Sequence, residues 1–269
     1  MWCKLNSAIR SSMPGIHKSL KQATHKWRTS QDPPFPIPSM LPGKFFWLHP
    51  SFLSHGNYEA CVQSQIKGHL KPGDVFMDVG ANVGFHTLLG AKLVGKKGRV
   101  LAFEPSDENL KLLVYHRRVN NLNQISIYSD ALGDEVNDSI DFILVDGGRH
   151  SSNSLTFKDK VAYIAEEQKQ VIQVSMTTID HVCQRENIAP KLIKIDVEGA
   201  ELFVLMGAKE VLAKYRPVII FGLHPFWMPG EHTPAKLANF LRDLDYGIRH
   251  IDGSKVKDFA FGDYIALPR

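Results

Sequence analysis

Acidic residues and glycines stand directly after a short apolar run, in a pattern suited to binding a ligand. The run 74–79 contains Asp78, and Gly80, Asn82 and Gly84 follow it. Glycine lets the backbone turn sharply and approach a ligand closely, and a helix that begins here directs its N-terminal amides at the same place. A carboxylate at this point suits a cationic group, so we expect these four residues to bind a cofactor.

Two further carboxylates follow at a regular interval. Glu104 ends the apolar run 99–104, and Asp130 and Ala131 come directly after the run 124–129. The step from Asp78 to Glu104 and the step from Glu104 to Asp130 are both 26 residues, as equal strand–helix units would give. In open α/β sheets, ligands bind at the carboxyl ends of the strands, where an acidic residue grips ribose hydroxyls. We therefore expect Glu104 on a ribose, and Asp130 with the Ala131 amide at an adenine edge.

A nicotinamide dehydrogenase is the sharpest alternative for such a pocket. Its fingerprint is Gly-x-Gly-x-x-Gly after the first strand. Gly80 and Gly84 instead stand four residues apart, with Ala81 and Asn82 among the residues between them. This spacing disfavours a cradle for a diphosphate.

Candidate catalytic residues end two later apolar runs, 191–196 and 217–223. Asp196 closes the first run, Glu198 lies just beyond it, and His224 follows the second. Asp196 and His224 are the natural general bases for an acceptor hydroxyl. All three side chains could instead share a divalent metal, because oxygen and imidazole ligands suit Mg, Mn or Zn. Glu198 has a simpler interpretation as a cap or first-turn acid of the next helix.

The elements that position these residues alternate along the chain after residue 70. Continuous apolar runs bounded by turn residues are typical of strands buried on both faces, and helical patterns separate them. Ser106 and Thr233 are predicted helix N-caps. The alternation predicts a mostly parallel sheet with right-handed crossovers. Additional strands are expected at 139–145 and 169–176, and a closing antiparallel hairpin at 246–251 and 259–267.

Charge and proline content divide the chain. Six lysines and arginines precede the first acidic residue, Asp32, and residues 31–44 are rich in proline. We therefore predict a basic arm with a proline-rich linker at 1–42 and a catalytic domain at 43–269. The arm suits peripheral contact with an anionic membrane surface or nucleic acid, or is simply a solvated extension.

Composition is that of an ordinary globular protein, with 43% hydrophobic and 22% charged residues. The sequence lacks an apolar run of the roughly 18 residues that span a bilayer and a secretory signal pattern. The three cysteines are odd in number and far apart, so no disulfide framework or zinc knuckle is expected. These features predict a cytoplasmic protein.

Three motifs resemble a known family when taken in order. They are Asp-Val-Gly-Ala-Asn-Val-Gly-Phe-His-Thr at 78–87, Ala-Phe-Glu-Pro at 102–105 and Lys-Ile-Asp-Val-Glu-Gly-Ala-Glu at 194–201. Over roughly residues 56–225 the chain resembles the FkbM-type methyltransferases, which are class I S-adenosylmethionine enzymes. The resemblance implies a Rossmann-like seven-stranded α/β sheet with helices on both faces. It also implies S-adenosylmethionine bound beside Asp78, Gly80, Asn82, Glu104 and Asp130.

The resemblance further implies O-methylation of a hydroxyl on a sugar, glycolipid or natural product, so the expected partner is a small-molecule or glycoconjugate acceptor. The polar segment 146–160, which contains His150, is predicted to cover that acceptor. RNA or protein methylation is an alternative, but only the basic arm favours a nucleic acid. A non-catalytic scaffold would show a degenerate glycine turn or lack the ribose acid, and the chain shows neither.

Overall fold

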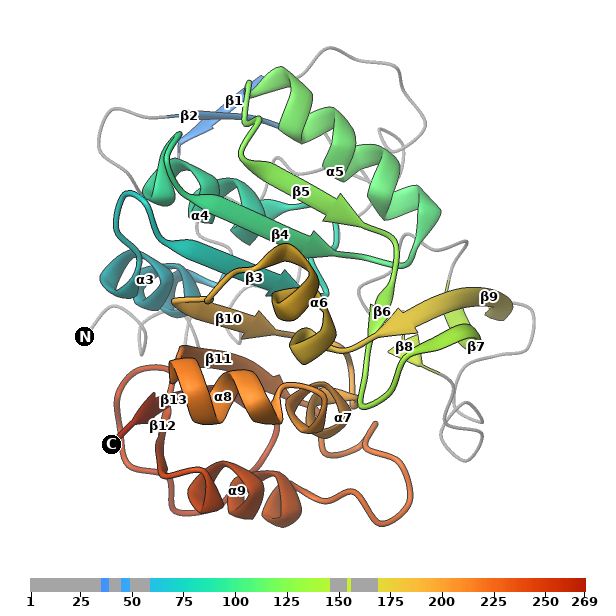
Figure 1. The fold of residues 1–269 in the computed structure, drawn as a ribbon, viewed down its shortest axis with the longest axis vertical. Coiled ribbons are helices and arrows are strands. Elements are labelled where there is room, and N and C mark those ends of the chain that lie inside the picture. Colours follow the sequence, from blue (N-terminus) through green and yellow to red (C-terminus); the bar gives the residue numbers. More distant parts are fainter. Residues whose placement is uncertain (1–34, 39–44, 49–58, 146–153, 156–168) are drawn as a thin grey trace, which may run out of the picture.

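A seven-stranded sheet forms the centre of the molecule (Figure 1). The computed structural model describes residues 35–38, 45–48, 59–145, 154–155 and 169–269. The strand order is β12-β13-β11-β10-β3-β4-β5, and β13 is antiparallel to both of its neighbours, whereas the other pairs are parallel. This confirms the predicted fold and its C-terminal hairpin. The strands are β3 (Val75–Val79), β4 (Arg99–Phe103), β5 (Ile125–Tyr128), β10 (Leu192–Ile195), β11 (Val218–Leu223), β12 (Tyr246–His250) and β13 (Gly262–Pro268).

The chain changes direction across the sheet between β3 and β10. From β3 it runs outward through β4 to β5, and it returns to place β10 on the other side of β3. Ligands of open α/β sheets bind at such a switch point, beyond the carboxyl ends of the strands. The register places Lys194 of β10 beside Asp78 of β3, so charged side chains of neighbouring strands meet at this point.

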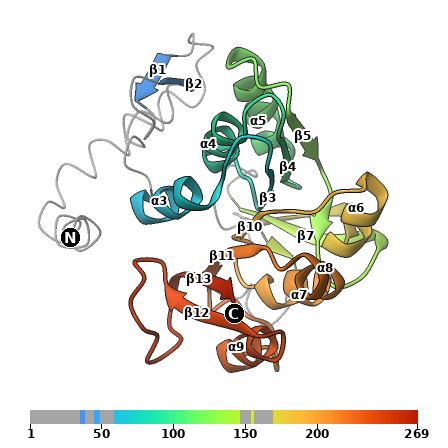
Figure 2. The same cartoon turned by 60° about the vertical axis from the view of Figure 1, so that its left-hand side comes forward.

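Helices cover both faces of the sheet (Figures 1 and 2). One face carries α3 (Ala60–His69), α4 (Phe85–Val94) and α5 (Asp107–Val119), and the other α6 (Ile179–Glu186), α7 (Glu201–Met206), α8 (Lys209–Tyr215) and α9 (Pro234–Asp243). Neighbouring residues of a strand enter two separate apolar clusters, one on each face of the sheet. In β3, Phe76 belongs to the cluster under α3, α4 and α5, and Met77 to the cluster under α6, α7, α8 and α9. Thr233 caps its helix as predicted, because its side chain accepts a hydrogen bond from the Lys236 amide.

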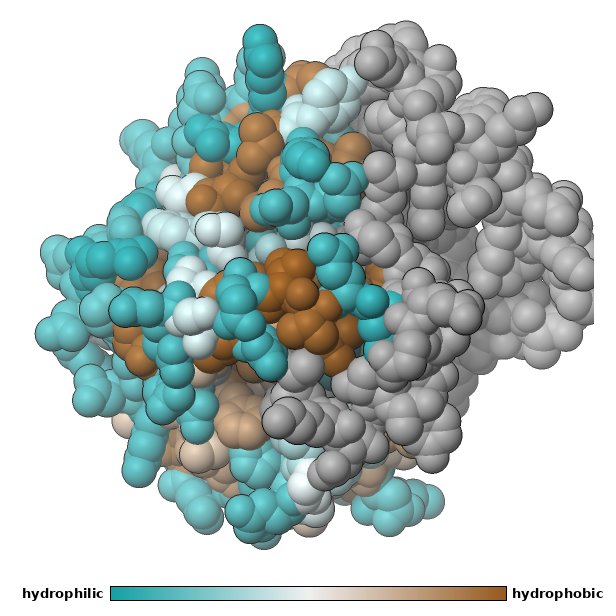
Figure 3. Space-filling view, turned by 90° about the vertical axis from the view of Figure 1, so that its right-hand side faces the viewer, coloured by the Kyte–Doolittle hydropathy of each residue, from teal (hydrophilic) through white to brown (hydrophobic). Residues whose placement is uncertain are grey.

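A second sheet stands beyond the carboxyl ends of the central strands (Figure 1). The two extra strands expected from the sequence are its longest members, and the structure adds two short ones. The order is β6-β9-β7-β8, from β6 (Ala131–Leu132), β7 (Asn137–Val145), β8 (Ser154–Leu155) and β9 (Lys169–Thr177). Figure 3 views this side of the molecule, where apolar patches lie between hydrophilic side chains. Val171 of β9 is an exposed apolar residue of this sheet, at 54%.

The N-terminal region contributes one small ladder to the described structure. Strands β1 (Phe35–Pro38) and β2 (Phe45–Leu48) pair antiparallel, across the predicted boundary between arm and domain. The basic residues of the arm lie outside the described residues, as does the predicted lid except for Ser154 and Leu155. Within the described part of the chain, no helix is long and apolar enough to cross a membrane.

The cysteine prediction needs one correction. Cys61 of α3 is disulfide-bonded, whereas Cys183 is a buried free thiol. Separation along the sequence does not tell which cysteines the fold brings together, because bonding depends on distances in space. The partner of Cys61 lies outside the described residues, and the cytoplasmic location stays a prediction.

Candidate functional site

A cavity of about 500 Å³ opens at the carboxyl ends of the central strands, between them and the second sheet. Its volume falls in the range of small-molecule sites, roughly 300–1,000 Å³. Two of the predicted residues, Asp78 and Gly84, do not line it. Eight others do, namely Gly80, Asn82, Glu104, Asp130, Ala131, Asp196, Glu198 and His224.

The glycine turn after β3 brings two strand ends into close contact. Gly80 has φ 75°, and a Cβ added there would collide with the backbone oxygen of Asp196. Only glycine therefore lets β3 and β10 approach at this point. Gly84 has φ 94° and precedes α4, but a Cβ there would collide with Leu113 of α5. Gly84 thus serves helix packing in this structure, away from the cavity.

Glu104 is a rigidly held carboxylate on the cavity wall. It is 5% exposed. Its Oε2 accepts the Asn82 amide at 2.8 Å, and its Oε1 accepts the Ser106 amide at 2.9 Å and the Asn109 side chain at 3.3 Å. Burial raises the pKa of Glu104 above its ordinary value, although these hydrogen bonds oppose the shift. The turn after β3 and the start of α5 therefore orient this side chain together.

Asp130, the acid that follows β5, is anchored from the second sheet. It lines the cavity, and Ser175 of β9 donates its hydroxyl to Oδ1 at 2.7 Å. Ala131 follows it as the first residue of β6 and is buried. The structure thus places both residues where an adenine contact was predicted, and the contact itself stays a prediction.

Asp78 lies behind the cavity wall rather than on it. The side chain is fully buried, and Thr87 of α4 donates a hydrogen bond to its Oδ2 at 2.6 Å. Its Oδ1 lies 3.8 Å from Nζ of Lys194, which does line the cavity. The charge of Asp78 therefore meets a lysine of the protein, whereas the sequence predicted contact with a cofactor.

Lys194 is a charged side chain that the sequence prediction did not single out. It is 4% exposed, and its Nζ lies 3.3 Å from Oδ2 of Asp196. Burial alone would lower the pKa of Lys194, but the charges of Asp196, Asp78 and Glu59 outweigh burial and raise it. The only signal in the sequence was one lysine inside an otherwise apolar strand.

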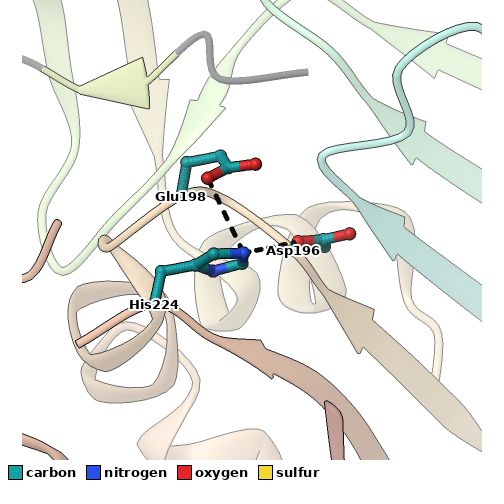
Figure 4. Close-up of side chains that lie close together, drawn as sticks. All are labelled: Asp196, Glu198 and His224. Carbon is teal, nitrogen blue, oxygen red and sulfur yellow. Dashed lines mark ion pairs between the residues drawn. The ribbon is translucent and has the colours of Figure 1, made fainter. Parts of the chain in front are cut away.

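Asp196, Glu198 and His224 come together at the ends of β10 and β11, as predicted from their places after the strands (Figure 4). The imidazole Nε2 lies 3.6 Å from Oε2 of Glu198 and 3.8 Å from Oδ1 of Asp196. Glu198 has φ 53° and precedes the N-cap Ala200, so it is not the cap of α7. The first-turn acid of that helix is Glu201.

Glu201 fixes the histidine from the other side. Its carboxylate is fully buried, and its Oε1 lies 2.7 Å from Nδ1 of His224. Burial alone would lower the pKa of His224, but hydrogen bonding to Glu201 and the nearby carboxylates raise it to about 9. Burial raises the pKa of Glu198 to about 7. Without a bound cation the surrounding carboxylates therefore favour the protonated imidazole.

Other residues of the cavity come from distant parts of the chain. His86 of α4 pairs with Glu59 at 2.8 Å, and burial raises the pKa of Asp263 to about 6. Phe261 is 76% exposed at the mouth, and its ring packs edge-on against His224 with centroids 5.4 Å apart. His86 belongs to the motif at 78–87, but no local motif marks Glu59, Phe261 or Asp263, because only the folded sheet brings them to the cavity.

Comparisons with known proteins agree with the sequence motifs. The model of the methyltransferase FkbM domain matches residues 78–248. A comparison with curated proteins gives no match.

Three solved structures show the range of similar proteins. Methyltransferase FkbM from Methylobacillus flagellatus is 19% identical with a TM-score of 0.48, over 77% of this chain and 50% of that protein. An S-adenosylmethionine-dependent O-methyltransferase from Thermotoga maritima is 13% identical (TM-score 0.43, 88% of this chain and 78% of that one). An rRNA methylase from Streptococcus thermophilus is 8% identical, with a TM-score of 0.41 over 77% of this chain and 92% of that one. The chain thus spans half the length of the first of these proteins.

Proposed function

The chain belongs to the FkbM family of S-adenosylmethionine-dependent methyltransferases, and we propose that it methylates a hydroxyl of a sugar, glycolipid or natural-product small molecule. One observation carries the proposal. The cluster of Asp196, Glu198 and His224 lies on the same cavity as Glu104 and Asp130. An acceptor hydroxyl at the cluster would therefore share one enclosed space with a cofactor held at the ends of β4 and β5.

The chemistry of the cavity wall fits S-adenosylmethionine. This cofactor supplies a methyl group on a positively charged sulfur, together with ribose hydroxyls, an adenine ring and an amino-acid end. Glu104 offers the ribose acid, and apolar side chains for the adenine line the same cavity at Phe103, Leu132 and Phe142. The described residues of the wall include six carboxylates and one lysine, so the wall favours a cationic ligand. We assign Lys194 to the carboxylate of the amino-acid end.

The cluster has two tasks in the transfer. The acceptor oxygen must lie in line behind the methyl group, and such positioning can account for about 7–11 kcal/mol of the barrier. As the oxygen–carbon bond forms and the carbon–sulfur bond breaks, the hydroxyl proton must leave. A carboxylate suits this step better than His224, because without a bound cation the raised pKa of His224 favours its protonated form. We assign Asp196, the more exposed carboxylate of the cluster, as the group that accepts the proton of the hydroxyl.

A nucleic acid is the less favoured acceptor on electrostatic grounds. Carboxylates at Glu59, Asp196, Glu198 and Asp263 surround the acceptor side of the cavity. Phosphates would be repelled there, whereas a neutral hydroxyl compound would not. Labelling of RNA or protein is nonetheless one of the outcomes that the experiment below distinguishes.

The test is transfer of labelled methyl from S-adenosylmethionine to a panel of sugars, glycolipids, RNA and protein. We expect an O-methylated small molecule and a loss of about 10²–10⁴ in rate for Asp196→Asn. Asp107→Asn removes an exposed acid of α5 and should leave the rate unchanged. Label found only on RNA or protein, or full activity in Asp196→Asn, would overturn the proposal.

A further inference from the structure

We propose that Asp196, Glu198 and His224 bind a divalent cation of the Mg²⁺ and Mn²⁺ class at the ends of β10 and β11. The sequence suggests a general base and a shared metal for these residues, and the geometry adds a metal to the role of Asp196 as proton acceptor proposed above. The argument that an ion binds depends only on these three residues and is independent of the proposed function. Only its role in turnover rests on the methyl transfer proposed above.

The distances from the imidazole of His224 to the two carboxylates suit ligands of one ion. One atom of each residue lies within 4.8 Å of the other two. His224 Nε2 is 3.6 Å from Glu198 and 3.8 Å from Asp196, beyond hydrogen-bond distance. Two ligands about 2.2 Å from one ion, at angles of about 90–120°, lie roughly 3.1–3.8 Å apart. The observed distances to the imidazole fall in that interval.

The orientation of His224 is an independent observation that points to a ligand. Its side chain is about nine-tenths buried, and Glu201 holds Nδ1 at 2.7 Å. Nε2 is thereby aimed between the two carboxylates (Figure 4) and has no hydrogen bond to any residue that the structure describes. Histidines that bind metals commonly donate their other ring nitrogen to a carboxylate in this way.

Asp196 divides its two oxygens between two neighbours. Lys194 donates to Oδ2 at 3.3 Å, which leaves Oδ1 on the side of His224. Gly222 of β11 keeps the space between them open, because a Cβ there would lie 2.9 Å from Oδ1 of Asp196 and 2.9 Å from Cε1 of His224. A small ion therefore has room at the cluster, and a larger residue at 222 would occupy that room.

Three protein ligands leave open positions toward the cavity. An acceptor with one or two hydroxyl oxygens could fill them, and a bound cation lowers the pKa of a hydroxyl that it contacts. Two carboxylate oxygens suit Mg²⁺ and Mn²⁺. The class of acceptor that this site favours is thus a compound with adjacent oxygens.

The test is titration of the full chain with Mn²⁺, in which the electron paramagnetic resonance signal of free Mn²⁺ falls on binding. We expect one Mn²⁺ per chain, displaced by excess Mg²⁺. Glu198→Gln should weaken binding at least tenfold. Asp263→Asn removes a carboxylate of the same cavity outside the cluster and should change the affinity less than threefold.

S-adenosylhomocysteine binding, measured on the same samples, reports on the fold and separates the two proposals. If Glu198→Gln does not bind S-adenosylhomocysteine, Asp196→Asn takes its place. Wild-type protein that binds S-adenosylhomocysteine but leaves the Mn²⁺ signal unchanged would overturn the metal site and leave the methyltransferase proposal standing. Equal Mn²⁺ affinity in wild type and Glu198→Gln would also overturn it. Mn²⁺ binding without S-adenosylhomocysteine binding would instead contradict the proposed function.

Discussion

Replacing Lys194 by methionine tests the electrostatic arrangement beneath the cavity. The side chains of Lys194 and Asp78 are 5% and 1% exposed, and Nζ lies 3.8 Å from Oδ1. Methionine keeps most of the apolar stem but removes the charge, so Asp78 would remain buried without its cation. Breaking a buried pair from one side costs about 3–5 kcal/mol. That is a large part of a typical unfolding free energy of about 5–15 kcal/mol.

The assay is urea unfolding of four proteins: wild type, Lys194→Met, Asp78→Asn and the double variant. We expect the double variant to recover at least about 1 kcal/mol of what Lys194→Met loses, because the uncompensated charge is gone. Lys111→Met is the matched control, since Lys111 pairs with Glu108 on the surface and such pairs contribute about 0–1 kcal/mol. A loss below about 1 kcal/mol in Lys194→Met, or strictly additive losses in the double variant, would refute the reasoning.

Three further predictions concern other parts of the fold. Gly80→Ala should destabilise by about 2–4 kcal/mol in denaturant unfolding, because its Cβ meets the Asp196 carbonyl at a positive φ; unchanged stability would contradict this close approach. Thr233→Ala should lose about 1 kcal/mol with the cap on the Lys236 amide, and Thr233→Ser should retain most of it. Burial raises the pKa of Cys183 to about 12, so mass spectrometry should find this thiol unalkylated at pH 8 until urea unfolds the chain; rapid native labelling would contradict its burial.

The strands and their order along the sheet edge could be predicted because buried parallel strands are almost continuously apolar. Asp196 and His224 meet because each directly follows a strand, and adjacent parallel strands end at the same edge. That rule needs no knowledge of loops. It also placed Glu104 and Asp130 correctly on the cavity.

Side-chain partners were harder to predict because they depend on register and rotamer. Asp78 points toward α4 and pairs with Lys194, since the register of β3 against β10 sets them side by side. Its place in the motif suggested direct contact with a cofactor, but position in a strand does not tell which face a carboxylate occupies. Glu201 was missed as the partner of His224 because the contact spans 23 residues and two elements.

The central claim is that S-adenosylmethionine binds at the ends of β3, β4 and β5, with Glu104 on its ribose. Calorimetric titration with S-adenosylhomocysteine tests this most directly, using wild type, Glu104→Gln and the exposed control Asp107→Asn. Hydrogen bonds to a charged group contribute about 1.5–3 kcal/mol, so Glu104→Gln should weaken binding roughly 10-fold to 150-fold, and Asp107→Asn should not. Absence of binding in wild type, or equal affinity in Glu104→Gln, would contradict the account.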